Sequence, residues 1–193
     1  MNTEMFTLRQ NLLKELEEYF GDDTKRINHA KKVLGFAEEL LKKENADWRI
    51  VIPASILHDV GIKVAEQKYG LSLGKLQEKE GPAIARNILM KVGLNKEEEI
   101  MEICDIIAHH HSPGKINPQN FEVLYDADWL VNLKDEVDTK NKAKLRKIIE
   151  KVFLTHSATS PNACHWGVRA ESPKGLSGLS LSVSTLRIPI DDA

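Results

Sequence analysis

Apolar residues recur every three or four positions through most of the first 155 residues, and this spacing restricts the fold more than any other feature. One such stripe consists of Ile27, Ala30, Val33, Leu34, Ala37, Leu40 and Leu41. No segment shows the apolar–polar alternation that is typical of a half-buried strand. The sequence therefore predicts an all-α fold, a compact bundle of about six to seven helices.

Glycine, proline and acidic residues mark the predicted helix ends. Gly21 is expected to end the first helix, and Asp22 or Asp23 is expected to cap the second. Pro82 is expected to begin a later helix, because proline is favoured at the first helical position. Residues 63–80 contain two glycines among mixed polar side chains, and we interpret them as a loop with at most a short helix.

The composition changes near residue 156. The last 37 residues contain seven serines and three prolines but only six charged side chains, and they show no helical period. We therefore predict a helical domain over residues 1–156. Residues 157–193 are interpreted as a low-charge tail, either disordered or an artefact of the reading frame.

The charge balance and the cysteine content limit the partners and the compartment. Lysine and arginine number 27 and aspartate and glutamate 29, so the formal net charge of −2 gives no general attraction to nucleic acid or anionic membranes. No apolar run reaches the ~18 residues that a membrane span needs. The N-terminal segment carries acidic residues and does not resemble a secretory signal, and two cysteines make no disulfide framework. We expect a cytoplasmic protein without membrane or nucleic-acid partners.

Ionisable side chains interrupt the apolar pattern at four places. They are His29, the pair His58–Asp59, the histidine run 109–111, and Asp126 together with Asp128. Each place has a structural explanation of its own: a hydrogen-bonded core histidine, a helix C-terminus closed by a glycine, a solvated helix end, and an N-cap at Asp126. Burial of an unpaired charge is costly, so the four places together require a common explanation.

A divalent metal ion provides that explanation. Such an ion binds neutral imidazoles and carboxylates that converge from several elements. His29, His58, Asp59 and Asp128 offer two of each, and their charge nearly cancels that of a dication. A metal would therefore explain why His58 and Asp59 directly follow an apolar helix face.

The ordered set His29, His58–Asp59 and Asp128 resembles the H…HD…D signature of the HD-domain superfamily of metal-dependent phosphohydrolases. The flanking segments RINHAKKV and SILHDVGIK agree with it, and ADWLVNL is similar to the ADRLHNM-type segment of ppGpp hydrolases. The resemblance covers roughly residues 23–135 and leaves Asp126 as a cap or a supporting residue. It implies an all-helical bundle with a divalent metal in its core.

The chain departs from several branches of that superfamily. Residues 61–63, Gly-Ile-Lys, replace the acidic pair of ppGpp hydrolases, and the glutamate that small nucleotidases carry after the HD pair is absent. The segments EGPAIARNIL and IIAHHH are instead similar to HD-GYP proteins and mixed-valent di-iron oxygenases, although the GYP motif is missing. This similarity implies a second metal ion bound by Asp59, Glu80, His110 and His111.

The resemblance implies a metal-dependent phosphohydrolase acting on a nucleotide or another small phosphate ester, with metal-activated water as the nucleophile. Asp59 would bridge two ions, and Lys63 is the second catalytic candidate. Arg86 and Asn132 are candidates for substrate binding, although Lys63 and Arg86 also fit a solvated surface. The metal, among Mn, Fe, Co, Ni, Zn and Mg, stays open, and Gln77 and Glu78 are polar residues without a defined role. The alternatives are a di-iron oxygenase similar to myo-inositol oxygenase, and a non-catalytic metal or nucleotide sensor.

Overall fold

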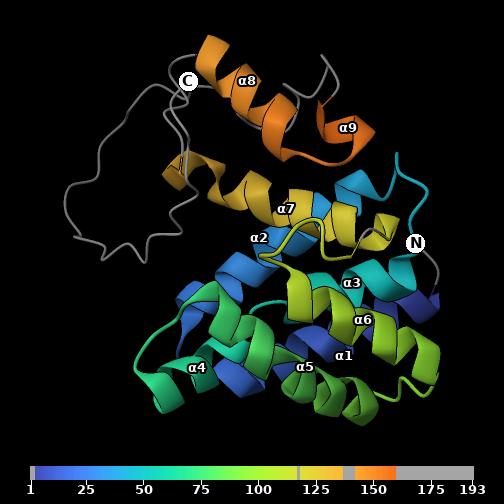
Figure 1. Ribbon diagram of the computed structural model, residues 1–193. Helices are drawn as coiled ribbons and strands as arrows, with labels where there is room; N and C mark the ends of the chain where they lie inside the picture. Colours follow the sequence, from blue (N-terminus) through green and yellow to red (C-terminus); the bar gives the residue numbers. More distant parts are fainter. Residues whose placement is uncertain (1–2, 117, 137–141, 160–193) are drawn as a thin grey trace.

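The computed structural model describes residues 3–116, 118–136 and 142–159. These residues form helices and no strand, so the all-α prediction is confirmed, although the helices outnumber the six to seven expected (Figure 1). In chain order the helices are α1 (Thr3–Phe20), α2 (Thr24–Leu40), α3 (Trp48–Leu57), α4 (Gly61–Tyr69), α5 (Gly74–Lys91), α6 (Glu97–His109), α7 (Gln119–Glu136), α8 (Lys142–Val152) and α9 (His156–Thr159).

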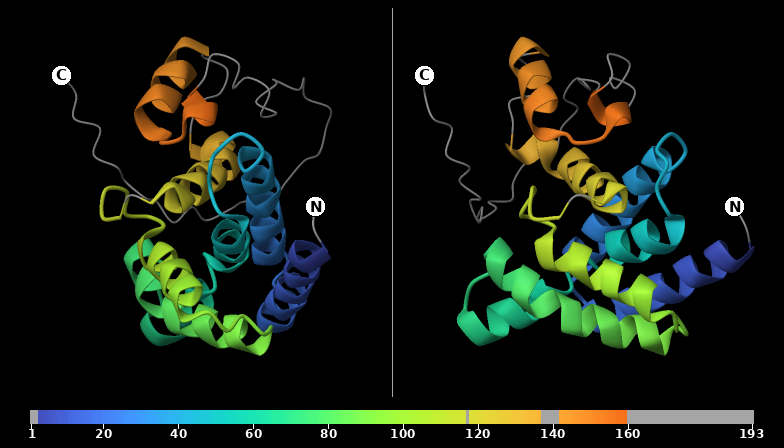
Figure 2. Two further views of the ribbon diagram at one scale, coloured as in Figure 1. Left: turned by 90° about the vertical axis from the view of Figure 1, so that its right-hand side faces the viewer. Right: turned by 45° about the vertical axis from the view of Figure 1, so that its right-hand side comes forward.

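Helix α3 forms the centre of the bundle. Every residue from Ile50 to Leu57 is buried, because the segment is apolar on all sides and has no polar face to turn toward water. Helices α1, α2, α6 and α7 pack around it (Figure 2). Its C-terminal end therefore places the next residues, His58 and Asp59, inside the bundle.

The ends of the first two helices follow the sequence. Helix α1 ends at Phe20, and Gly21 follows it with a positive φ of 60° while its N–H donates to Glu17 O over 2.8 Å. The side chain of Asp23 accepts from the N–H of Arg26 and caps α2. Both predicted boundaries are confirmed.

The predicted loop over residues 63–80 and the predicted helix start at Pro82 are wrong. Residues 61–69 form α4, and α5 begins at Gly74 and continues through Pro82. The two helices pack closely: a Cβ on Gly61 would lie 2.2 Å from the backbone oxygen of Gln77. Packing of this kind outweighs the local preferences of glycine and proline, which are the signals that the sequence offers.

Helix α7 lies along α2 and brings the second half of the chain to the site (Figure 1). Near the end of the described part, α9 crosses the predicted domain boundary at residue 156, and Ala158 is buried. Most of the predicted tail, residues 160–193, lies outside the described residues. Within the ranges that are described, no helix combines the length and the hydropathy of a membrane span.

Candidate metal centre

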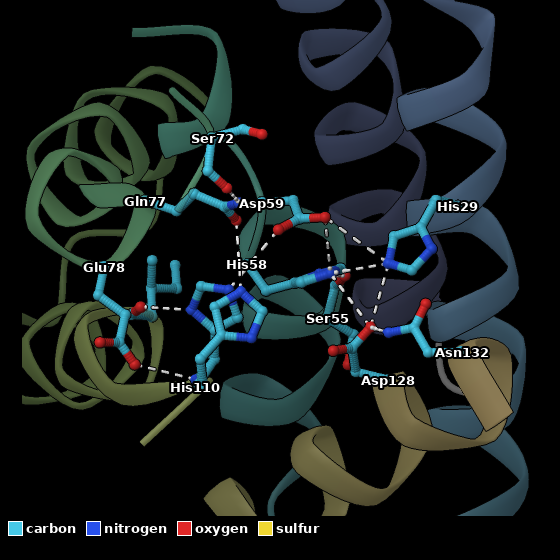
Figure 3. Close-up of polar contacts among 12 residues, drawn as sticks. His29, Ser55, His58, Asp59, Ser72, Gln77, Glu78, His110, Asp128 and Asn132 are labelled. Atoms are coloured by element: carbon cyan, nitrogen blue, oxygen red, sulfur yellow. Dashed lines mark hydrogen bonds and ion pairs between the residues drawn. The ribbon is translucent and has the colours of Figure 1, made fainter. Parts of the chain in front are cut away.

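Helices α2 and α7 and the turn 58–60 bring four predicted ligands together inside the bundle (Figure 3). His29 Nε2 lies 3.1 Å from Asp128 Oδ1 and 3.3 Å from His58 Nε2. Asp59 Oδ2 lies 3.4 Å from His58 Nε2 and 3.6 Å from His29 Nε2. Donor atoms from three distant segments thus meet at one place.

These distances suit the ligands of one ion. Donor atoms with bonds of about 2.0 to 2.2 Å to the same ion are separated by roughly 3.0 to 3.5 Å from each other. His29 Nε2 and His58 Nε2 lie 3.1 to 3.7 Å from each other and from the nearest oxygens of Asp59 and Asp128. Two imidazoles and two carboxylates are also the donor types that a divalent transition metal prefers.

Backbone carbonyls fix the orientation of two histidine rings. His58 Nδ1 lies 2.9 Å from Ser55 O, and His110 Nδ1 lies 2.7 Å from Ile107 O. A carbonyl oxygen only accepts, so each Nδ1 carries a proton, and the ring would present Nε2 to a metal ion when that nitrogen is unprotonated. His110 Nε2 is buried without a hydrogen-bond partner and lies 3.6 Å from Asp59 Oδ1. A buried imidazole nitrogen that faces a carboxylate without a hydrogen bond is compatible with a cation between the two.

Asp59 lies between two groups of donors. Its Oδ2 is near His29 and His58, whereas its Oδ1 is near His110. Asp59, His110 and His111 form a second group in which one donor atom of each lies within 4.8 Å of the others. A carboxylate in this position suits a bridge between two ions.

Charge within the site favours a cation. Burial lowers the pKa of His58, but the carboxylates of Asp59 and Asp128 outweigh it and raise the pKa to about 9. Burial raises the pKa of Asp59, yet the neighbouring histidines hold it well below its usual range. A divalent ion would therefore compete with a proton at His58. Burial lowers the pKa of His111 to about 4, so this imidazole is neutral at pH 7.

Glu80 does not join the second group. Its carboxylate accepts from Lys68 Nζ over 2.6 Å and from the hydroxyl of Tyr69 over 2.8 Å. The reason is the helical phase, because α5 starts at Gly74 and turns position 80 away from the histidines. The residues of α5 that are buried are Gln77, Glu78, Gly81, Ala85, Ile88 and Leu89.

Lys63 and Arg86 have other partners in the structure. Lys63 Nζ donates to Tyr19 O over 2.7 Å and lies 5.1 Å from the centre of the Tyr19 ring. Arg86 Nη2 donates to both carboxylate oxygens of Glu97 over 2.7 Å. No hydrogen bond or ion pair within the described ranges joins either cation to the predicted ligands, which favours their interpretation as surface residues.

Asn132 lies beside the predicted metal ligands. Its Nδ2 donates to Asp128 Oδ1 over 3.0 Å, one turn along α7. This hydrogen bond orients the Asp128 carboxylate toward His29. In the histidine run, His109 Nδ1 lies 2.8 Å from Asp105 O in an exposed contact, which separates His109 from the two histidines that face Asp59.

Two buried residues of α5, Gln77 and Glu78, acquire roles that the sequence did not define. The carboxylate of Glu78 accepts from the N–H of His111 over 2.9 Å and from the hydroxyl of Ser112 over 3.0 Å. Gln77 Oε1 lies 3.3 Å from His111 Nε2. The signal that would identify Gln77 and Glu78 is their position on the buried face of a helix. It was missed because residues 63–80 were interpreted as a loop.

Asp126 supports the fold and is not an N-cap of α7, because that helix begins at Gln119. Its Oδ1 accepts from the N–H of Leu154, and its Oδ2 accepts from the N–H and the hydroxyl of Thr155, over 2.7 to 2.9 Å. Burial raises the pKa of Asp126 to about 6 despite these hydrogen bonds. The side chain thus joins α7 to the segment that precedes α9.

We expect Asp126→Ala to lower the free energy of unfolding by about 3 kcal/mol, because three donors lose their acceptor in a buried place. Denaturant unfolding of the metal-free protein measures the change. Asn120→Ala at the start of the same helix is the control and should cost less, because the two hydrogen bonds that it removes, to Glu102 and from the N–H of Asp47, are less buried. Equal losses would mean that the segment around Thr155 contributes little to stability.

The comparisons with known proteins agree with this geometry. The model of the HD domain family matches residues 26–154. A crystal structure of a predicted HD superfamily hydrolase from an uncultured Thermotogales bacterium is similar to this chain, with 25% identity and a TM-score of 0.57. The similarity covers 78% of this chain and 80% of that chain. No curated protein matches the sequence.

Proposed function

Since this chain belongs to the HD-domain family, we propose that it is a metal-dependent phosphohydrolase acting on a nucleotide or another small phosphate ester. Family membership and the similarity to a predicted HD superfamily hydrolase support a metal-dependent hydrolase in general. The observation that carries the proposal is the convergence of His29, His58, Asp59 and Asp128 from separate segments into one donor set, in which His58 and Asp128 are buried and the other two are partly buried.

Each side chain of the donor set has a proposed role. A divalent ion held there supplies Lewis acidity, which polarises a phosphoryl oxygen and lowers the pKa of water toward about 7. His29, His58 and Asp128 hold the ion, and Asn132 fixes the Asp128 carboxylate through its hydrogen bond. Asp59 faces both groups of donors with its two oxygens and is the residue that links them.

Among the described residues, the two cations predicted to bind phosphate have other partners. Arg86 is paired with Glu97, and Lys63 contacts Tyr19, so their contacts do not support a role at the substrate. Asn132 stays as the proposed polar contact with the substrate. Its amide has a second N–H donor and an accepting oxygen besides the N–H that it donates to Asp128. Charge compensation of the phosphate then depends mainly on divalent metal.

A panel of nucleotides and small phosphate esters tests the proposal. Protein treated with chelator should lose phosphate release by at least about a hundred-fold, and Mn²⁺, Co²⁺ or Mg²⁺ should restore it, because the reaction needs a Lewis acid. Phosphate is measured on each substrate before and after the metal is returned. Hydrolysis that chelation leaves unchanged would contradict the proposal.

The second group of donors supports a different candidate, a di-iron oxygenase. Asp59 shared between two sets of histidines suits a pair of redox-active ions as well as a pair of Lewis acids. Iron in the purified protein with oxygen consumption would favour this candidate. Nucleotide binding without turnover on the whole panel would favour a sensor.

A further inference from the structure

Gln77 is a buried amide whose orientation is fixed, and it faces the second group of donors (Figure 3). Only 6% of the residue is exposed. Its Nε2 donates to Ser72 O over 2.7 Å. A carbonyl oxygen accepts only from the nitrogen of the amide, so the amide oxygen must point the other way. That oxygen, Oε1, lies 3.3 Å from His111 Nε2.

The second group lacks one donor for a four-coordinate site. Asp59, His110 and His111 provide three donors, the number that a catalytic zinc site takes from the protein, whereas a closed zinc site takes four. Glu80, the residue expected to complete the set, is bound to Lys68 and Tyr69. A side-chain amide oxygen is a hard donor that binds divalent ions.

The distance between Gln77 and His111 is that of two ligands of one ion. The 3.3 Å separation equals the distance between His29 Nε2 and His58 Nε2 in the first group. The backbone around Gln77 is held rigidly, because its carbonyl oxygen packs against Gly61 at the start of α4. The amide oxygen is therefore in place without a rearrangement of α5.

We propose that Gln77 Oε1 is the fourth protein donor of a second divalent metal site, together with Asp59, His110 and His111. Glu78 is the positioning residue of this site, since its carboxylate holds the backbone N–H of His111 and the hydroxyl of Ser112. This inference rests on one part of the proposed function, namely that the centre binds divalent metal. It assigns the role expected of Glu80 to a residue one helical turn earlier.

Zinc titration of the metal-free full-length protein tests the assignment. The wild-type protein should bind two equivalents. Gln77→Leu, which keeps the volume but removes the oxygen, should bind the first normally and the second at least about ten-fold more weakly. Gln77→Glu keeps an oxygen donor and should retain the second ion. The matched control is Glu80→Ala on the same helix, which should bind both ions as the wild type does.

Nitrogen NMR of the wild-type protein distinguishes ligation from a mere hydrogen bond. The side-chain amide resonance of Gln77, assigned with Gln77→Leu, should shift with the second equivalent of zinc, whereas that of Asn132 should respond to the first. His111 Nε2 should carry metal after the second equivalent. A proton that stays on His111 Nε2, or an unchanged second affinity in Gln77→Leu, would overturn the assignment. The His111 Nε2 signal is read on the wild-type protein alone, so this readout holds even if Gln77→Leu fails to fold.

The outcomes separate this inference from the function on which it rests. Binding of a single zinc ion by the wild type overturns the role of Gln77 but leaves a one-metal hydrolase intact. Binding of two ions without phosphate release on the panel leaves the site intact and removes the proposed activity. Binding of no metal removes both.

Discussion

His58→Ala is expected to abolish binding of the first metal ion and to lower kcat/KM for phosphate release by about a thousand-fold or more. His58 is fully buried, and its Nε2 lies 3.3 to 3.7 Å from donor atoms of His29, Asp59 and Asp128. Alanine removes one of the two imidazoles that lie close to both carboxylates. Elemental analysis of the purified variant and its steady-state kinetics measure the two effects.

Two aspartates on α7 provide a matched control. Asp128→Asn removes a carboxylate that contacts His29, whereas Asp126→Asn alters one that serves Leu154 and Thr155. We therefore expect Asp126→Asn to retain more metal than Asp128→Asn. The reverse order of metal content would indicate that Asp126, and not Asp128, is the metal ligand. Hydrolysis that persists unchanged in both His58→Ala and Asp128→Ala would indicate a contaminating enzyme or a different site.

Gly61→Ala is expected to lower the free energy of unfolding by about 3 kcal/mol or more. The added Cβ would lie 2.2 Å from the backbone oxygen of Gln77 and 2.7 Å from the backbone nitrogen of Gly81. Both atoms belong to the backbone of α5, so the clash is relieved only if α4 and α5 move apart. Denaturant unfolding of the metal-free protein gives the change in stability without a contribution from bound metal.

Gly35→Ala is the control for this effect. Gly35 lies inside α2, has no positive φ, and has no atom within 4 Å of an added Cβ. Alanine should leave stability unchanged or raise it by about 0.5 to 1 kcal/mol, because it loses less backbone entropy than glycine on folding. A similar loss in both variants would mean that the α4–α5 contact is looser than the structure has it.

Much of the fold was predictable because apolar periodicity survives in the packed protein. The stripe expected on α2 from Ile27 to Leu40 is buried, as predicted. The region around α4 and α5 was not predictable, since Gly70, Gly74 and Pro82 are local signals for a loop. The close contact of Gly61 with α5 outweighs these signals. It joins Gly61 to Gln77 and Gly81, which belong to a different helix.

The first group of donors was more predictable than the second. His29, His58, Asp59 and Asp128 are recognisable as an ordered set, and the structure brings them together, while their binding of metal stays a prediction. In the second group, the choice between Gln77 and Glu80 depends on where α5 begins. Positions 77 and 80 are three residues apart, so their side chains lie about 60° apart around the axis and nearly one turn apart along it, and the sequence misplaced that helix start.

The sequence by itself determined the helical class, the buried face of α2 and the order of the metal-binding candidates, because all three depend on spacing along the chain. Only the tertiary structure decided the partners of the charged side chains. Glu80 pairs with Lys68, Arg86 with Glu97, and Lys63 with the backbone of Tyr19. These contacts depend on how separate helices pack against one another. The spacing of residues within one helix carries no information about that packing.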